Sequence, residues 1–500
     1  MVGATMTGDS EAREAPICEA VDVAVIGSGF SGIGMGAALK REGRRSFVIL
    51  ERDGDLGGTW RDNRYPGCAC DVPSALYSYS WAPNPHWTRA FSPQPEIWAY
   101  LKRVAADCGL GPHLRFNAGV EVAKWDEASG RWRLAIADGR TVSARVVVAG
   151  TGALSRPALP AIEGLESFEG AVMHSARWRD DVAFADKRVA VVGAGASAIQ
   201  IVPQLAPAAR RLTVFQRTAP WIIPKPDRAI SERTREAFAR QPWRQQAWRL
   251  FLYAMLEKNA VARMHPPLAA GPERLARRHL EAQVADPALR AKLTPDYRLG
   301  CKRVLISDDY YPALQRPNVA LETAPIARVE ARALFTADDR RIEADVLVMA
   351  TGFDVTNPQA DPMEVVGRDE LRLKTAWSEG AQAHLGITVA GFPNWFILMG
   401  PNTGLGHNSM IFMIESQIAY VMSALRRMDR AAIRALEVRP EIQAAFVAEV
   451  DRRMAGTVFA SGCSSWYLGA LKRNTTVWPG FTFDYRARTR AIELRDYRID

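Results

Sequence analysis

Two glycine-rich loops in the sequence have the spacing with which proteins bind dinucleotides. In the first loop, Gly27 permits a tight turn, Gly29 lets backbone N–H groups approach a pyrophosphate, and Gly32 lets a helix pack against a strand. Glu51, which lies 24 residues after Gly27, can accept hydrogen bonds from a ribose. A chance glycine turn is the alternative, but the flanking strand and helix patterns and the acid all agree with a dinucleotide site.

The second loop has the same form, but the strand after it ends differently. This loop consists of Gly193, Gly195, Ser197 and Ala198, with alanine in the tolerated third position. The next strand ends in Arg217 and Thr218, a cation and a hydroxyl, where an NAD site has a carboxylate. Arginine suits phosphate by bidentate hydrogen bonding, although a strand-end arginine can also be a solvated surface residue. We predict that Arg217 recognises a 2′-phosphate, so that the first loop holds FAD and the second holds NADPH.

The elements that must position these loops form two strand–helix–strand units. Apolar runs and helical periodicity predict the units at 21–26, 33–41 and 47–50 and at 188–192, 198–205 and 212–215. Two further buried strands, 145–149 and 345–349, each run into a Thr-Gly step that suits a crossing between modules. A strand at 395–399 and the loop 400–404 then lead into a helix at 409–425, whose N-terminus can face an anion or an electron-rich ring.

These units predict an α/β fold with two Rossmann-like dinucleotide-binding domains, one for FAD and one for NADP, and a helical insertion. The predicted order is a first FAD segment at 1–156, a first NADP segment at 157–227, the insertion at 228–299, a second NADP segment at 300–386 and a second FAD segment at 387–500. The insertion contains an aromatic stretch at 243–253. A helix on a membrane surface is the alternative for this stretch, but Arg and Glu interrupt its apolar face.

Charge and hydrophobic pattern limit the possible functions. The 500 residues include 64 Lys and Arg against 55 Asp and Glu, which gives a formal net charge of +9. No run of basic residues exceeds two, which disfavours nucleic acid, and the phosphates of two dinucleotides match the excess charge better. The first twenty residues lack the basic start and apolar run of a signal peptide, and no apolar run has membrane-spanning length. We therefore expect a cytoplasmic protein without a membrane span.

The six cysteines and seven histidines do not have the spacing of metal ligands, so no metal site is predicted. Buried free thiols are the expectation for the cysteines, in keeping with a reducing compartment. Cys68 and Cys70 are separated by one residue, which would strain a disulfide between them. A redox pair is therefore not expected there.

Further motifs surround the two loops. One consists of Gly57-Gly58-Thr59-Trp60, four residues, Tyr65-Pro66-Gly67, three residues and Asp71. Another, just before the second glycine loop, consists of Phe168, Gly170, His174 and Trp178. Together with Lys302-Arg303 and Ala350-Thr351-Gly352-Phe353-Asp354, these motifs resemble the Baeyer-Villiger monooxygenase family over residues 21–478. One departure is Arg179, where that family tends to have Pro or Asp.

The resemblance implies an oxygenating flavoprotein. In that family NADPH reduces FAD, oxygen adds at flavin C4a, and the resulting peroxyflavin attacks a ketone to give an ester or a lactone. Arg303 matches the family's catalytic arginine, which would stabilise the peroxide anion and then the oxyanion of the adduct, and Asp71 would pair with it. A surface basic pair is the alternative for Lys302 and Arg303, but their position between the insertion and an apolar run favours function.

The resemblance also assigns residues around the cofactors. Lys302 would join Arg217 and Thr218 around the 2′-phosphate, and His174 would order the hinge between the modules. Trp466 resembles a tryptophan on a mobile loop that touches NADP, and for this residue core packing is the alternative. The expected neighbours of FAD are Thr59, Trp60, Tyr77 and Met410, of which Met410 can equally be a core residue.

Three other functions share part of this pattern. A flavin monooxygenase acting by N- or S-oxygenation keeps the cofactors, but Trp178, Arg303 and Asp71 disfavour it as the main activity. A dehydrogenase or disulfide reductase would have a CxxxxC pair after the first unit, and the sequence has none. A non-enzymatic flavin-binding regulator would not need Asp71 or Arg303. The expected partners are O2 and a ketone, or a sulfide, with the chain acting as a monomer or a homodimer.

Overall fold

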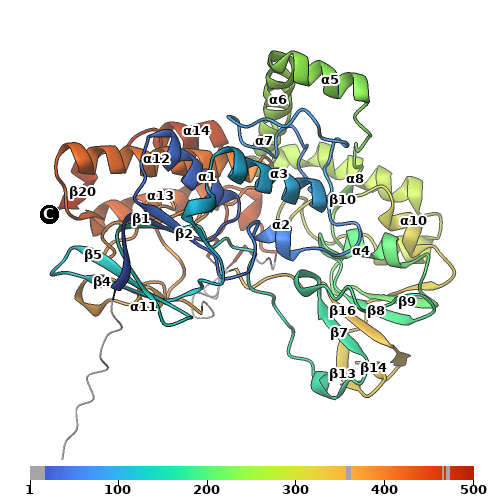
Figure 1. The fold of residues 1–500 in the computed structure, drawn as a ribbon. Coiled ribbons are helices and arrows are strands. Elements are labelled where there is room, and N and C mark those ends of the chain that lie inside the picture. Colours follow the sequence, from blue (N-terminus) through green and yellow to red (C-terminus); the bar gives the residue numbers. More distant parts are fainter. Residues whose placement is uncertain (1–16, 356–361, 464, 466, 469–472) are drawn as a thin grey trace, which may run out of the picture.

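The computed structural model describes residues 17–355, 362–463, 465, 467–468 and 473–500 (Figure 1). A first module at the left of Figure 1 contains both the blue N-terminal part and the red C-terminal part of the chain. A second module, in green and yellow, lies at the lower right, and a group of helices lies above it. The chain therefore leaves the first module, builds the second, and returns.

The first module is built on an eight-stranded sheet. Its strands are β1 (Ile17–Ile26), β2 (Phe47–Leu50), β3 (Leu114–Arg115), β4 (Val120–Asp126), β5 (Arg131–Ile136), β6 (Thr141–Ala149), β17 (Glu364–Val366) and β18 (Trp395–Ile397). β1 is parallel to β2 and β6, β18 joins β6, and β4 and β5 extend the sheet as antiparallel strands. Because β17 pairs with β4, the chain is back in the first sheet by Glu364, before the return predicted at residue 387.

Both faces of this sheet are buried at its central parallel strands β1 and β2. On β1, Val23 and Val25 belong to one apolar cluster and Ala24 and Ile26 to another, as the alternation of side chains along a strand requires. A parallel strand covered on both faces reads as a continuous apolar run, which is why the sequence at 21–26 lacks a polar face. The second cluster also contains Trp132.

Helix α1 (Phe30–Arg41) lies close to the sheet and to α12 (Met410–Arg430) because glycines remove side chains where these elements meet. A Cβ at Gly34 would lie 2.9 Å from Ile418 Cδ1 of α12, and one at Gly36 would lie 2.7 Å from Ile49 Cδ1 of β2. Glycine in a helix costs about 1 kcal/mol relative to alanine, so the close packing must offset this cost. The other helices of the module are α2 (Thr59–Asp62), α3 (Gln94–Asp107), α11 (Leu373–Ala376), α13 (Pro440–Ala455) and α14 (Thr482–Arg488), with the strand pair β19 (Leu436–Val438) and β20 (Tyr497–Ile499).

The second module has a five-stranded parallel sheet in the order β12-β9-β8-β16-β7. Its strands are β7 (Ala171–His174), β8 (Arg188–Val192), β9 (Arg211–Phe215), β12 (Val319–Glu322) and β16 (Val346–Met349). Helix α4 (Ala198–Leu205) connects β8 to β9, so this unit has the strand–helix–strand form that the sequence predicts. Helix α10 (Tyr310–Leu314) precedes β12, and β13 (Ile326–Glu330), β14 (Ala333–Thr336) and β15 (Arg341–Glu343) form a small antiparallel sheet beside the module.

The helical insertion has a short stem of two strands. β10 (Ile222–Ile223) is parallel to β11 (Leu305–Ile306), so the two ends of the insertion meet. Between them the chain forms α5 (Glu232–Arg240), α6 (Pro242–Glu257), α7 (Asn259–Met264), α8 (Ala270–Gln283) and α9 (Pro287–Lys292). In Figure 1, α5 and α6 project from the top of the molecule. Within the described part of the chain, no helix is both long enough and apolar enough to cross a membrane.

The expectation of free thiols is wrong for two of the six cysteines. Cys301 and Cys463, which are 162 residues apart, form a disulfide with their Cα atoms 6.3 Å apart. Spacing in the sequence could not reveal this bridge, because it joins the segment after the insertion to the segment after α13. Cys301 is buried in an apolar cluster that includes Val458 and Phe459. The remaining cysteines, Cys18, Cys68, Cys70 and Cys108, are free, and Cys68 and Cys70 are buried as expected.

We predict that alkylation of the denatured, unreduced protein labels four cysteines, whereas alkylation after reduction labels six, because two thiols are held in the bridge. Intact-protein mass spectrometry gives the count. In a Cys301→Ser variant, Cys463 loses its partner and five cysteines are labelled with or without reductant. A matched Cys108→Ser variant keeps the difference of two. Labelling of all six wild-type cysteines without reductant would show that the bridge is absent.

Candidate active site

The first glycine loop lies where β1 turns into α1. Gly27 has φ +95°, and a Cβ there would lie 2.7 Å from Gly150 O, while a Cβ on Gly32 would lie 1.8 Å from Gly27 O. Only glycine fits these two positions. At Gly29 the nearest atom to a Cβ would be Gly58 Cα at 3.8 Å, which leaves the front of the loop open. The first turn of α1 has no side-chain cap, so its N–H groups can face a pyrophosphate.

Glu51 lies at the end of β2 beside this loop, and only 4% of it is exposed. Its Oε2 accepts hydrogen bonds from Ser28 N at 2.9 Å and Ser28 Oγ at 2.6 Å. Its Oε1 accepts from Arg61 Nη1 at 3.0 Å and from Asp53 N at 3.1 Å. These donors fix the carboxylate where the ribose is expected. Sequence reasoning missed Ser28 and Arg61, although Ser28 lies inside the glycine loop and Arg61 directly follows the Gly-Gly-Thr-Trp motif.

The Gly-Gly-Thr-Trp turn lies against the first glycine loop. Gly58 has φ +51°, and a Cβ there would lie only 3.3 Å from Gly29 Cα, so glycine at this position lets the two turns lie close together. Thr59 is the first residue of α2. Trp60 is buried, and its Nε1 donates to Tyr77 Oη at 3.0 Å. Burial raises the pKa of Tyr77, so its hydroxyl stays protonated. The structure therefore brings Thr59, Trp60 and Tyr77 to the predicted FAD loop.

Met410, the remaining predicted neighbour of FAD, and Trp466, the predicted neighbour of NADP, have different outcomes. Met410 is the first residue of α12, is half-buried and packs against the main core. This position agrees with Met410 as a core residue, and its role beside FAD stays a prediction. Trp466 lies outside the described residues.

The second glycine loop repeats the geometry of the first. Gly193 has φ +122°, and a Cβ there would lie 2.3 Å from Ala350 O. At Gly195 a Cβ would meet no atom within 4 Å, so the space in front of this loop is open. Ser197 is the N-cap of α4 without a side-chain cap bond, and Ala198 is fully buried at the third position. An anion can therefore approach the N-terminus of α4.

Arg217, Thr218 and Lys302 lie near this loop. Arg217 is exposed and follows β9, and Thr218 is next to it. Lys302 comes from the segment before β11, and burial, together with the nearby Arg217, lowers its pKa. Among the described residues, neither Arg217 nor Lys302 forms an ion pair with a carboxylate. Two neighbouring cations without a paired anion suit a phosphate.

Asp71 and Arg303, which are 232 residues apart in the sequence, form an ion pair. Arg303 Nε donates to Asp71 Oδ2 at 3.0 Å, and Nη2 donates to the same oxygen at 2.5 Å. Asp71 belongs to the loop after α2, in the first module, whereas Arg303 follows the insertion. The carboxylate raises the pKa of Arg303 above its ordinary value, so the guanidinium remains charged. The pairing that the resemblance implies is present in the structure.

Two residues near this pair were not predicted. Tyr467 lies close enough to Arg303 to interact with it electrostatically, and burial raises the pKa of its hydroxyl. Arg263 of α7 donates to Asn259 O at 3.1 Å and to Gly406 O, and burial lowers its pKa to about 10. Tyr467 follows Trp466 in the sequence and could have been suspected. Arg263 lies in the insertion, where no motif marks it.

The linker residues lie where the second module joins the first. His174 ends β7, and its ring makes an edge-to-face contact with Phe353, with ring centres 5.7 Å apart. Burial lowers the pKa of His174, which favours the neutral ring. Trp178 is buried and stacks on Phe184 at 5.3 Å. His174 thus touches the second crossing between the modules at the predicted hinge.

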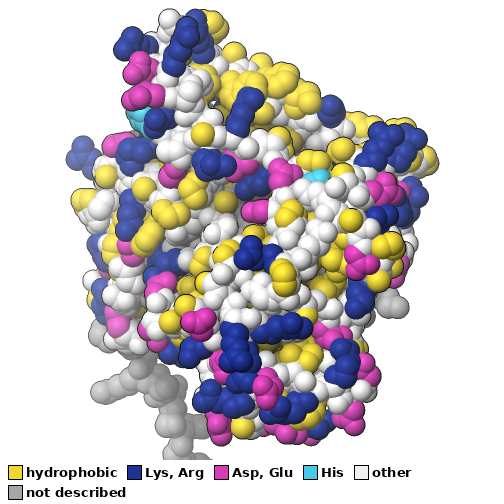
Figure 2. Space-filling model, turned by 90° about the vertical axis from the view of Figure 1, so that its right-hand side faces the viewer, with side chains coloured by type: hydrophobic (Ala, Val, Ile, Leu, Met, Phe, Trp, Pro, Cys, Tyr) yellow, Lys and Arg dark blue, Asp and Glu magenta, His cyan; other side chains and the backbone are white. Residues whose placement is uncertain are grey.

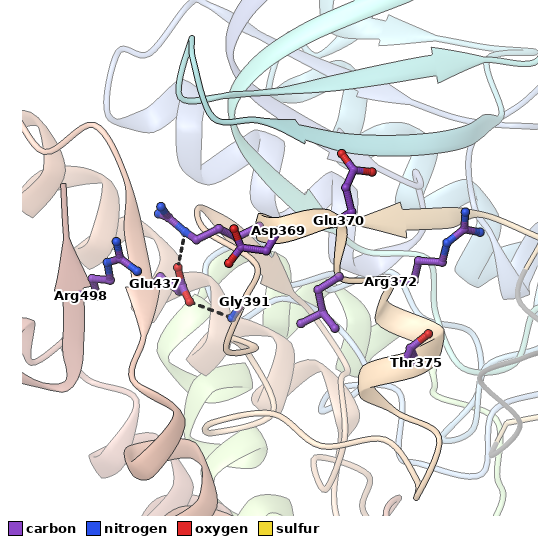
Figure 3. A pocket seen from close by; sticks show the side chains of 9 residues that line it. Asp369, Glu370, Arg372, Thr375, Gly391, Glu437 and Arg498 are labelled. Carbon is purple, nitrogen blue, oxygen red and sulfur yellow. Dashed lines mark hydrogen bonds and ion pairs between the residues drawn. The ribbon is translucent and has the colours of Figure 1, made fainter. Parts of the chain in front are cut away.

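A separate pocket of about 510 Å³ lies by β17 and β19 (Figure 3). Arg368 lines this pocket and forms ion pairs with two carboxylates. Its Nε lies 2.9 Å from Glu437 Oε2, and its Nη2 lies 2.7 Å from Asp500 Oδ2. Its Nη1 lies 2.5 Å from Glu127 Oε1, and Glu437 also accepts a hydrogen bond from Gly391 N. None of the predicted site residues lines this pocket. Three carboxylates surround the arginine, so these residues form a structural ion-pair network.

The residues present fit both predicted cofactors. The first loop offers open space, free N–H groups and an acid for a ribose, and the second offers open space, free N–H groups and two cations for a phosphate. The Asp71–Arg303 pair adds a fixed cation that belongs to neither loop. This arrangement can bind two dinucleotides and stabilise negative charge on a reacting group.

Comparison with known proteins agrees with this arrangement. Residues 20–373 match the family model described as flavin-binding monooxygenase-like. A Baeyer-Villiger monooxygenase of Streptomyces coelicolor is 49% identical over 98% of this chain and 94% of its own length. A Baeyer-Villiger monooxygenase of Pseudomonas aeruginosa is 47% identical over 95% of this chain and 91% of its own length.

A solved structure has the same fold. The structure of OTEMO in complex with FAD and NADP aligns with a TM-score of 0.86 and 27% identity, covering 96% of this chain and 99% of that one. The two modules, each built on a sheet with a parallel strand–helix–strand unit, and the helical insertion are therefore the α/β architecture that the sequence predicts. Family model, relatives and fold agree along nearly the whole chain. The chain belongs to the flavin-binding monooxygenase-like family, and within it to the Baeyer-Villiger monooxygenases.

Proposed function

We propose that this chain uses NADPH and O2 to insert one oxygen atom next to a ketone carbonyl, giving an ester or a lactone. The single observation that carries this function is the Asp71–Arg303 pair, a fixed cation beside two dinucleotide-binding loops. With both cofactors bound, FAD reduced by NADPH would supply the electrons that activate O2, so that one oxygen atom enters the ester or lactone and the other leaves as water. The enzyme is an NADPH-dependent Baeyer-Villiger monooxygenase, in keeping with its relatives.

We assign Arg303 the role of stabilising negative charge on the reacting oxygen atoms. A unit charge about 4 Å from an anion contributes roughly 4 kcal/mol at an effective dielectric constant of about 20. Arg303 is suited to this role because Asp71 holds two of its nitrogens and leaves part of the guanidinium accessible. The raised pKa of Arg303 means that it provides charge and hydrogen bonds but does not transfer a proton. Asp71 positions it.

We assign the cofactor contacts to the residues around the two loops. For FAD, Gly29 would approach the pyrophosphate and Glu51 would accept hydrogen bonds from the ribose. A ribose hydroxyl would then share the Glu51 carboxylate with Ser28 and Arg61, or replace one of these donors. For NADPH, Gly195 and Ser197 would approach the pyrophosphate. The further contacts proposed for FAD and NADPH are Gly27, Gly32, Thr59, Trp60, Asp71, Tyr77, Met410, Gly193, Ala198, Arg217, Thr218, Lys302 and Trp466.

The substrate is a small molecule, and we propose a ketone as its class, with a sulfide as the alternative. An electron-rich sulfur needs no oxyanion stabilised on the substrate, so the fixed cation favours the ketone. We propose a cytoplasmic location, which the use of NADPH and the four free cysteines support, whereas the Cys301–Cys463 bridge is of a kind more common in oxidising compartments. A monomer or a homodimer is our proposal for the assembly.

Incubation of the purified protein with NADPH, O2 and a panel of linear, cyclic and aryl ketones plus one sulfide tests the reaction class. We expect esters or lactones as the main products, identified by mass spectrometry, because the Asp71–Arg303 pair supports attack on a carbonyl. Sulfoxide formation without any ester would instead favour S-oxygenation as the main activity.

We predict that Arg303→Ala lowers ester formation by roughly 10²- to 10³-fold, the usual effect of removing one oxyanion-stabilising group. NADPH oxidation and bound FAD should persist, because the glycine loops do not depend on Arg303. Product and NADPH are measured together, so that the ratio of ester to NADPH consumed gives the coupling. Arg303→Lys is the matched control. Lysine keeps the positive charge but lacks the planar guanidinium with its several donors, so this variant should retain part of the coupling. Full ester formation by Arg303→Ala would refute the role.

We predict that Arg217→Ala raises the KM for NADPH by roughly 10- to 100-fold and changes the KM for NADH little, because only NADPH has the 2′-phosphate. Steady-state oxidation of the two nucleotides measures both constants. Arg211→Ala is a matched control, since Arg211 is an exposed arginine at the other end of β9. Equal changes for NADPH and NADH would argue against the assignment.

A further inference from the structure

Helix α6 fully buries only polar residues and leaves large apolar residues exposed, although Leu252, Tyr253 and Leu256 are half-buried. In a globular protein the apolar side of such a helix faces the core and the polar side faces water. In α6 the buried residues are Gln245, Arg249 and Glu257. The exposed residues include Trp243, at 66% exposure, and Leu250, at 67%.

The inward side of α6 is held by hydrogen bonds. Gln245 Nε2 donates to Asn84 O at 2.7 Å, and Arg249 Nη1 donates to Ala75 O at 2.7 Å. Glu257 accepts from Thr482 N at 2.5 Å and from Thr482 Oγ1 at 2.9 Å. These contacts reach the loop before α3 and the start of α14, so they fix the rotation of α6 about its axis. The apolar side is therefore held outward.

The outward side is a continuous apolar surface, which we call the α6 face. With about 100° per residue, positions 243, 247, 250, 251 and 254 lie on one side of the helix. Phe251 is 51% exposed and stacks on Trp248 with ring centres 5.3 Å apart. The α6 face consists of Trp243, Ala247, Trp248, Leu250, Phe251, Ala254 and Met255. Large exposed apolar patches usually mark a binding surface.

The insertion around this face is strongly basic. Residues 228–299 include 14 Lys and Arg and 7 Asp and Glu, so 14 − 7 = +7, compared with 64 − 55 = +9 for the whole chain. Arg244 and Lys258 lie at the two ends of α6, are exposed, and form no ion pair with a described residue. Figure 2, which looks onto the side of the molecule with the insertion, shows uncovered hydrophobic side chains among basic ones at the top.

We propose that the α6 face binds peripherally to an anionic lipid bilayer. The 16-residue helix would lie along the surface, with its apolar side among the acyl chains near the headgroups and Arg244 and Lys258 at the phosphates. Tryptophan suits this depth because its ring is both apolar and polar. A second copy of the chain is a poorer partner, because a symmetric contact through this face would bring two insertions of charge +7 together.

Sedimentation of the purified, FAD-loaded enzyme with lipid vesicles tests this proposal. We expect the wild type to sediment with vesicles of equal parts phosphatidylcholine and phosphatidylglycerol at low ionic strength, and less with pure phosphatidylcholine. The double variant Leu250→Gln/Phe251→Gln should bind at least about tenfold more weakly to both, because it removes apolar contact. Arg244→Gln/Lys258→Gln should weaken binding to the anionic vesicles alone.

Leu159→Gln is the matched control, since Leu159 is 60% exposed but lies outside the insertion, and it should bind like the wild type. NADPH oxidation, FAD content and melting temperature should be unchanged in all variants, because the altered side chains are exposed. The proposal is overturned if the wild type does not sediment with the anionic vesicles, or if the Leu250/Phe251 variant binds as well as the wild type. A dimer in light scattering that this variant dissociates, without vesicle binding, would assign the face to a second copy.

Discussion

The ion pair between Asp71 and Arg303 connects parts of the chain that no local interaction would bring together. One partner follows the Gly-Gly-Thr-Trp turn of the first module, and the other follows the helical insertion. A charge that is partly withdrawn from water must be paired, and leaving one partner alone is costly. The pair is therefore both an attachment between modules and the source of a fixed positive charge. The β10–β11 stem and the Cys301–Cys463 bridge restrain the segment that carries Arg303 from either side.

Positive charge is the common property of the space around this pair. Arg303 has Asp71 as its partner, but Arg263, Lys302 and Arg217 have no carboxylate in ion-pair contact among the described residues. Two of these four cations lower the pKa of a neighbouring one, since Arg303 acts on Arg263 and Arg217 acts on Lys302. Such an excess is unfavourable in the free protein and becomes favourable when phosphates and a developing anion enter. The electrostatics thus favour the bound, reacting state over the empty one.

Local patterns in the sequence predicted much of this structure. The glycine loops, Glu51 and the two strand–helix–strand units follow from turn geometry and hydrophobic periodicity, and the pairing of Asp71 with Arg303 followed from the family resemblance. Features that depend on contacts distant in sequence were missed, as the Cys301–Cys463 bridge and the pairing of β17 with β4 show. For α6, the sequence did not reveal which side of the helix faces inward. Arg and Glu were expected to interrupt the apolar face of this segment, but Arg249 and Glu257 of α6 point inward to hydrogen-bond partners that only the fold supplies.

The two-stranded stem of the insertion has a consequence for how this protein can diverge. Because β10 and β11 are adjacent and parallel, the chain leaves and re-enters the second module at nearly the same place. Everything between these strands is a single excursion, and the part of it before Lys302 and Arg303 can change in length and composition without altering the register of either main sheet. Variation can then accumulate in the insertion while both nucleotide loops stay constant. A lineage, or an engineer, could exchange the helices of this segment as a cassette, provided that Lys302 and Arg303 at its end are kept.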